Sequence, residues 1–107
     1  MKNEIEKNWD EMSKAYENFT ESEDSYSYKI EWPCIKKMLP DLHGKKVLDL
    51  GCGTGRFGFL FEKENPISVL GIDISEKMLN IAREKALNRG SKAKFIKGDI
   101  SNLNTCI

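Results

Sequence analysis

The sequence predicts an α/β fold built on the first half of a doubly wound parallel sheet, a βαβαβ unit preceded by two helices. Two observations predict it. From Lys45 onward, short apolar runs that end near Gly or Asp alternate with segments of helical periodicity, and the connections between them are short. Such alternation gives parallel strands with right-handed crossovers. We therefore expect residues 1–44 to be a helical segment and residues 45–107 a partial sheet domain that stops after its third strand.

The segment before Lys45 is predicted to form two helices. In the first, apolar residues recur at steps of four, three, four and three, which places them on one face, opposite a solvated polar face. These residues are Ile5, Trp9, Met12, Tyr16 and Phe19. The polar stretch from Thr20 to Ser27 predicts a loop. A second helix is expected to start at Trp32-Pro33, because proline fits the first helical turn, and to stop at Pro40. Its expected apolar face comprises Ile35, Met38 and Leu39.

Three strands and two helices are predicted downstream. Val47–Leu50 and Ile67–Ile72 are apolar runs typical of buried strands, and Ala93–Lys97 is the third strand. Between the first two strands, Phe57, Leu60 and Phe61 follow helical spacing. The second helix is expected to begin after Ser75, a good N-cap, and to end at Gly90, which is typical of a C-terminus. Its apolar stripe is Met78, Leu79, Ala82 and Ala86.

The composition argues against several classes of protein. The chain carries 17 Lys and Arg against 17 Asp and Glu, and nucleic-acid or anionic-membrane binders need a basic surplus. No apolar run approaches the ~20 residues that cross a bilayer. The charged start lacks the apolar region of a signal peptide, so a cytoplasmic location is expected. Cys34, Cys52 and Cys106 are widely spaced, which indicates neither a disulfide framework nor a zinc site, and no metal is expected.

Acidic residues lie at the ends of the three predicted strands, at the edge where open α/β sheets bind ligands. Asp49 precedes the loop Gly51-Cys52-Gly53-Thr54-Gly55, whose glycines allow tight turns and close approach of the backbone to a ligand. Asp73 closes the second strand, where a carboxylate can accept two hydrogen bonds from a ribose diol. Asp99, followed by Ile100, closes the third strand and can accept from an exocyclic amine.

The glycine loop admits a second interpretation. Gly53 to Gly58 matches GxGxxG, and Asp73 follows at the distance that a dinucleotide fingerprint requires. In that register Asp49 would lie inside the strand as a costly buried carboxylate. If Gly51 is instead the first glycine, Asp49 lies at the mouth of the strand, where it can meet a cation such as an amino-acid ammonium. This favours an adenosyl ligand with an amino-acid tail over a nucleotide pyrophosphate.

The motifs VLDLGCGTG, GIDIS and KGDIS, between Lys45 and Ser101, resemble those of class I S-adenosylmethionine-dependent methyltransferases in order and spacing. The segment with Trp9, Asp10, Ala15 and Tyr16 is similar to the helix that often precedes this domain. The resemblance implies a Rossmann-like sheet with strand order 3-2-1 in this half. It also implies S-adenosylmethionine as cofactor, S-adenosylhomocysteine as product, and methyl transfer to an acceptor, for which a small molecule is expected.

The same resemblance assigns roles at the methionine end of the cofactor. Asp49 and the loop Gly51-Cys52-Gly53-Thr54-Gly55 would hold the methionine part. Tyr16 would cover this end, as aromatic residues of the front helix do in some relatives.

At the adenosine end, the resemblance implies that Asp73 binds the ribose hydroxyls and that Ile74 packs on adenine. Asp99 would accept from the adenine amine, with the Ile100 backbone beside it. No catalytic residue is assigned, because nothing after the third motif carries an acceptor-binding pattern.

Two alternatives stay open: a non-catalytic S-adenosylmethionine-binding or interaction module on the same half-fold, and a fragment of an NAD-dependent oxidoreductase. In the complete sheet of the family the first strand is central, whereas the three strands predicted here would leave Val47–Leu50 without a neighbour on one side. Because an unpaired apolar strand edge invites association, we expect the chain to self-associate through it.

Overall fold

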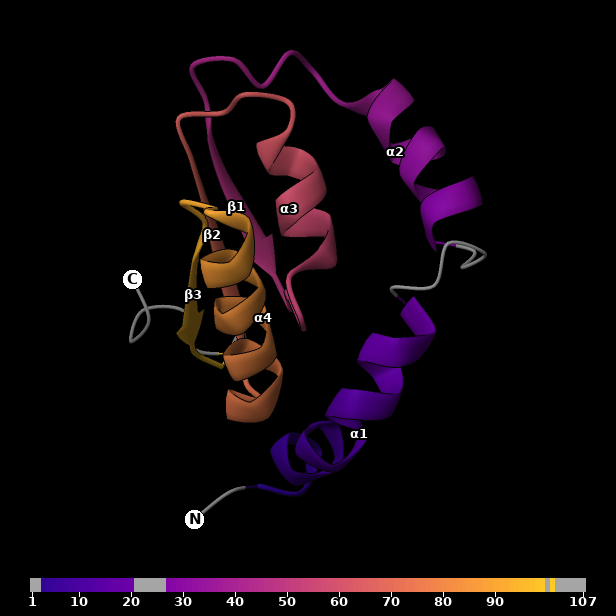
Figure 1. The fold of residues 1–107 in the computed structure, drawn as a ribbon, viewed down its shortest axis with the longest axis vertical. Coiled ribbons are helices and arrows are strands. Elements are labelled where there is room, and N and C mark those ends of the chain that lie inside the picture. The colour runs from indigo at the N-terminus through magenta and orange to yellow at the C-terminus, as the bar shows by residue number, and fades with distance from the viewer. Residues whose placement is uncertain (1–2, 21–26, 100, 102–107) are drawn as a thin grey trace.

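The computed structural model describes residues 3–20, 27–99 and 101, and it has the predicted α/β order (Figure 1). The front segment forms α1 (Glu4–Thr20), a π-helical turn η1 (Ser27–Glu31) and α2 (Trp32–Met38). The sheet unit follows as β1 (Lys46–Leu50), α3 (Arg56–Glu62), β2 (Ser68–Asp73), α4 (Glu76–Arg89) and β3 (Lys94–Lys97). The strands are parallel and lie in the order β1-β2-β3, so the predicted fold is confirmed.

The hydrophobic core lies between one face of the sheet and the helices α3 and α4. Its buried members are Cys52, Phe59, Val69, Leu79, Ala82, Ala86, Ala93 and Phe95. Gly71 of β2 lies where this packing is tightest, because a Cβ atom there would lie 2.7 Å from the Phe95 ring and 2.8 Å from Cys52. A side chain at this position would therefore push the β2 backbone away from its neighbours.

The helix α4 begins and ends as the sequence predicts. The Ser75 hydroxyl oxygen accepts a hydrogen bond from the Met78 amide at 3.2 Å, which is the N-cap interaction. Gly90 ends the helix in the left-handed conformation, with φ of 63°. The predicted apolar stripe of α4 is buried on the core.

The helix α1 docks with a different face from the one that its apolar periodicity indicates, namely the neighbouring polar stripe. Glu6, Asp10 and Ser13 are buried, whereas Ile5, Trp9 and Met12 are 65%, 40% and 51% exposed. The expectation that the apolar stripe packs against the rest of the chain is therefore wrong. The physical reason is that α1 crosses the polar start of α4 and the charged end of β3, where buried carboxylates find donors.

The second front helix, α2, starts at Trp32 as predicted and ends at Met38, with Leu39 already extended. It packs through Trp32, whose ring centroid lies 5.5 Å from that of Phe61 on α3. Met38 is 77% exposed, so its expected place on the packed face is wrong. Most of the predicted loop between Thr20 and Ser27 lies outside the described residues, and the turn η1 after it was not expected.

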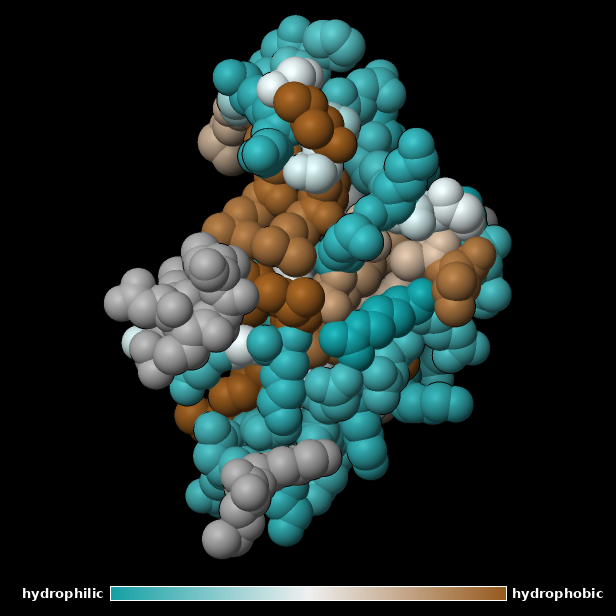
Figure 2. All heavy atoms as spheres, turned by 90° about the vertical axis from the view of Figure 1, so that its left-hand side faces the viewer, coloured by the Kyte–Doolittle hydropathy of each residue, from teal (hydrophilic) through white to brown (hydrophobic). Residues whose placement is uncertain are grey.

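The second face of the sheet carries Leu48 and Leu50 on β1, which are 46% and 45% exposed. Leu48 pairs with Leu70, and Leu50 pairs with Ile72, so the apolar face continues onto β2. Figure 2 shows hydrophobic side chains gathered on the side of the molecule where the sheet lies in Figure 1. None of the helices in the described part of the chain is long and apolar enough to cross a membrane.

Candidate functional site

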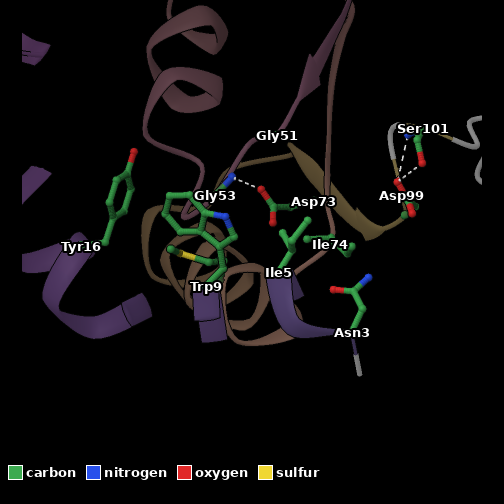
Figure 3. A pocket seen from close by; sticks show the side chains of 12 residues that line it. Asn3, Ile5, Trp9, Tyr16, Gly51, Gly53, Asp73, Ile74, Asp99 and Ser101 are labelled. Atoms are coloured by element: carbon green, nitrogen blue, oxygen red, sulfur yellow. Dashed lines mark hydrogen bonds between the residues drawn. The ribbon is translucent and has the colours of Figure 1, made fainter. Parts of the chain in front are cut away.

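A pocket of about 460 Å³ opens at the carboxyl ends of the strands, between α1 and the loops that follow β1, β2 and β3 (Figure 3). Its described lining is Asn3, Ile5, Trp9, Tyr16, Gly51, Gly53, Asp73, Ile74, Met78, Gly98, Asp99 and Ser101. Six of the predicted site residues are therefore brought together: Tyr16, Gly51, Gly53, Asp73, Ile74 and Asp99. This is the edge at which open parallel sheets bind ligands.

The glycine loop turns sharply beneath the pocket. The amides of Gly51 and Cys52 both donate to the Ile72 carbonyl, at 2.7 and 3.1 Å, so the loop is fixed to the end of β2. Gly51 and Gly53 have φ of 71° and 56°, a region that residues with a Cβ atom rarely adopt. The backbone of both glycines consequently forms part of the pocket wall.

Asp73 at the end of β2 is held from two sides. One carboxylate oxygen accepts from the Gly53 amide at 2.9 Å, and the other accepts from the Ser75 amide at 3.0 Å. A carboxylate oxygen has two acceptor positions, so each keeps one for a ligand. Figure 3 shows the Asp73 side chain beside Ile74 and facing Gly53. The backbone on both sides of the pocket edge therefore fixes the orientation of this carboxylate.

Asp99 lies at the rim of the pocket, after β3. Its carboxylate accepts from the Ser101 amide at 2.9 Å and from the Ser101 hydroxyl at 2.6 Å. These two hydrogen bonds lower the pKa of Asp99 below its ordinary value. The side chain is exposed, so the turn presents an ionised carboxylate at the rim of the pocket.

Asp49 does not lie at the mouth of β1, and that expectation is wrong. The strand continues through Leu50, and Asp49 pairs with Gly71 inside the sheet, on the same face as Val47. Its carboxylate points toward α3, 3.9 Å from where a Cβ atom of Gly58 would stand. Burial, and to a lesser extent the charge of Asp73, raises the pKa of Asp49 to about 6. Asp49 is not part of the described pocket lining, and its role in binding stays a prediction.

The other predicted residues of the glycine loop lie behind the pocket wall. Cys52, Thr54 and Gly55 are buried and do not line the pocket. Burial and the charges of Asp73 and Asp49 raise the pKa of the Cys52 thiol to about 12, so it stays protonated at neutral pH and is a poor nucleophile. The Thr54 hydroxyl is buried without a hydrogen-bond partner among the described residues. Ile100 lies outside the described residues.

The helix α1 supplies a wall that the sequence interpretation largely missed. Ile5 and Trp9 line the pocket together with Tyr16, and the Trp9 and Tyr16 rings meet edge to face with centroids 5.8 Å apart. The sequence does contain a signal for this arrangement: α1 carries a second, polar stripe with the same helical period, made of Glu6, Asp10, Ser13 and Glu17. Across the described part of the chain, no group of three or more His, Cys, Asp or Glu side chains could hold a metal ion.

Comparisons with known proteins agree with this fold. A family model described as a methyltransferase domain matches residues 41–106, so the chain belongs to the methyltransferase-domain family. The resemblance to class I S-adenosylmethionine-dependent methyltransferases is thereby confirmed, and S-adenosylmethionine is the cofactor of that class.

Three similar proteins illustrate the relationship. The carboxy-S-adenosyl-L-methionine synthase of Wolinella succinogenes is 49% identical over 61 residues, which cover 53% of this chain and 25% of the synthase. The PH0226 protein of Pyrococcus horikoshii OT3 is 39% identical, with a TM-score of 0.66 over 83% of this chain and 42% of that one. A methyltransferase from Thiobacillus denitrificans, in complex with S-adenosyl-L-homocysteine, is 30% identical, with a TM-score of 0.56 over 66% of this chain and 29% of that one. The chain thus spans less than half of the length of each.

Proposed function

We propose that the pocket binds S-adenosylmethionine and that the chain is the cofactor-binding part of an enzyme that methylates a small-molecule acceptor. The Asp73 carboxylate carries this proposal. It borders the pocket and is fixed by the amides of Gly53 and Ser75, with acceptor positions left over. Such a carboxylate suits the two hydroxyl groups of a ribose, because both of its oxygens can accept charge-assisted hydrogen bonds.

The charge of the pocket supports a cationic ligand. Among the described residues that line it, Asp73 and Asp99 are carboxylates, and none is Lys, Arg or His. A pyrophosphate would meet two negative side chains and no basic partner there, which is unfavourable. The sulfonium and ammonium groups of S-adenosylmethionine match this field. The volume of about 460 Å³ is within the range of small-molecule sites.

The residue roles that we propose follow the shape of the pocket. Asp73 would bind the ribose and Ile74 would pack on adenine, with Asp99 accepting from the adenine amine. Gly51, Gly53 and Tyr16 would border the methionine part. Cys52, Thr54 and Gly55, which lie outside the pocket lining, would contribute through the shape of the loop. The binding roles of Asp49, inside β1, and of Ile100 remain sequence predictions.

When bound, S-adenosylmethionine supplies an activated methyl group on its sulfonium, so the protein needs no strong nucleophile of its own. This chain would then orient the bound S-adenosylmethionine and exclude water from it. Asp73 and the glycine loop would fix the adenosyl part, while Trp9 and Tyr16 of α1 would cover the pocket on the other side. The negative charges of the Asp73 and Asp99 carboxylates would in addition stabilise a positively charged ligand.

Calorimetric titration with S-adenosylhomocysteine tests the proposal through Asp73→Ala. We expect this substitution to weaken binding by about 1–3 kcal/mol, because two hydrogen bonds to a charged group are lost. Asp41→Ala is a matched control, since Asp41 is an exposed acidic residue outside the pocket lining and its loss should leave affinity unchanged. Asp73→Asn, which keeps the size of the side chain, serves if Asp73→Ala does not fold. Unchanged affinity in both Asp73 variants would contradict the ribose assignment.

The same titrations separate the two alternatives. Tight binding of NAD without a response to S-adenosylhomocysteine would replace the proposal with a nucleotide-dependent oxidoreductase. The family assignment and the absence of basic residues from the described lining favour methyl transfer over that reading. Binding of S-adenosylhomocysteine without methyl transfer to any acceptor would favour a non-catalytic binding module.

A further inference from the structure

The polar stripe by which α1 docks contains three connections to the sheet unit. At one end the Lys97 ammonium donates to Glu6 at 2.6 Å, and at the other the Lys85 ammonium donates to Glu17 at 2.8 Å. Between these ion pairs lies Asp10, which is 5% exposed and contacts the start of α4. The central connection differs from the outer two because it leads into the pocket.

Asp10 caps α4 from outside that helix. One of its carboxylate oxygens accepts from the Ser75 hydroxyl at 2.5 Å and from the Lys77 amide at 3.3 Å. The Ser75 hydroxyl oxygen in turn accepts from the Met78 amide at 3.2 Å. A negative charge is favourable at this position, because the first amides of a helix are unpaired and carry a partial positive charge.

Ser75 connects this cap to the candidate cofactor site. Its amide donates to one oxygen of Asp73 at 3.0 Å, and the other oxygen of Asp73 takes the Gly53 amide at 2.9 Å. One series of hydrogen bonds thus runs from Asp10 through Ser75 and Asp73 to the glycine loop. Ser75 is fully buried, and hydrogen bonds in such desolvated networks are costly to leave unmade.

We propose that Asp10 is a positioning residue of the cofactor site: it fixes Ser75, Ser75 fixes the Asp73 carboxylate, and the docking of α1 is thereby coupled to ribose binding. This inference rests on the proposed function. Trp9, the neighbour of Asp10 in the chain, lines the pocket on the same helix. Docking of α1 therefore closes one wall of the pocket and orients its binding carboxylate at the same time.

The test compares Asp10→Ala with Glu17→Ala in the full 107-residue chain, with S-adenosylhomocysteine titrated by calorimetry. Both substitutions remove a contact between α1 and α4, but Glu17 binds Lys85, away from Ser75 and Asp73. Asp10→Ala should weaken binding about tenfold, since a charged hydrogen-bond acceptor is lost. Glu17→Ala should change it by less than about twofold, because the partly buried Glu17–Lys85 pair shares no partner with Ser75 or Asp73. Asp10→Asn keeps a hydrogen-bond acceptor without the charge, so this variant should bind S-adenosylhomocysteine about threefold more weakly than the unaltered chain.

Two further measurements separate positioning from a general loosening of the helix. 5′-Methylthioadenosine keeps the ribose, so Asp10→Ala should weaken its binding by the same factor as that of S-adenosylhomocysteine. In the ligand-free chain, hydrogen exchange at the amides of Lys77 and Met78 should speed up in Asp10→Ala and not in Glu17→Ala. The exchange measurement does not depend on any ligand.

The outcomes are distinguishable. Equal losses of affinity in Asp10→Ala and Glu17→Ala, or unchanged affinity in Asp10→Ala, would overturn the inference. If Asp10→Ala does not fold, an unchanged affinity in Asp10→Asn overturns it instead, and a loss near threefold supports it. If the unaltered chain binds no S-adenosylhomocysteine, the proposed function fails. Unchanged hydrogen exchange at the Lys77 and Met78 amides in Asp10→Ala would separately show that Asp10 does not hold Ser75.

Discussion

Two carboxylates on neighbouring strands lie in different environments. Asp73 accepts backbone hydrogen bonds at the edge of the pocket, whereas Asp49 lies deeper in the sheet and feels the charge of Asp73. Burial disfavours the ionised form of Asp49, and its pKa rises from 3.8 to about 6. The folded chain therefore keeps a proton on Asp49 at pH values where the unfolded chain has already lost it.

This difference predicts a pH dependence of stability. Between pH 4 and 6 the folded state binds the additional proton, so the free energy of unfolding should fall as the pH rises through this window. Asp49→Asn should remove the fall and raise stability at pH 7 by roughly 1–3 kcal/mol. Urea unfolding at a series of pH values measures the free energy of unfolding of each variant, with Asp41→Asn as a control at an exposed carboxylate. Identical pH profiles for Asp49→Asn and the unaltered chain would refute the assignment.

At the scale of elements, α1 shows that amphipathic periodicity identifies a helix without identifying its docked face. Its two stripes share one period, and the polar one is buried because the start of α4 and the end of β3 offer hydrogen-bond donors. The apolar stripe stays half exposed and borders the pocket through Ile5 and Trp9. A ligand in the pocket would cover part of this apolar surface.

The orientation of α1 can be tested by comparing two adjacent residues. Met12 is 51% exposed, so Met12→Gln should change the free energy of unfolding by less than about 0.5 kcal/mol. Ser13 is buried, so Ser13→Leu should cost about 1–3 kcal/mol through overpacking. Chemical denaturation followed by the loss of helical circular dichroism measures both. The reverse order of effects would mean that the apolar stripe is the docked face.

At the scale of the whole molecule, the sheet is covered unevenly. Both helices of the core, α3 and α4, pack on one face, while Leu48 and Leu50 on the other are almost half exposed. Among the described strands, β1 pairs with β2 alone, so its second edge carries unpaired backbone groups. The division into residues 1–44 and 45–107 stays a prediction, although α1 packs directly on α4.

We propose from this exposed edge that the chain self-associates. Sedimentation velocity at micromolar concentration should show species larger than the monomer, and Leu48→Lys should shift the distribution toward the monomer, because a charge on an edge strand opposes strand addition. Met38→Lys is the control, since Met38 is also exposed but lies on α2. A stable, folded monomer of the unaltered chain at these concentrations would contradict the proposal.

The sequence by itself determined the order of the elements, the caps of α4, the glycine loop and the acidic ends of β2 and β3. Each of these depends on residues close together in the chain, such as Ser75 and Met78. Only the tertiary structure decided the docked face of α1, the place of Asp49 inside the sheet and the link from Asp10 to Asp73. These depend on what lies opposite: Asp10 meets Ser75 across 65 residues, and a local pattern contains no information about the donors that a distant segment supplies.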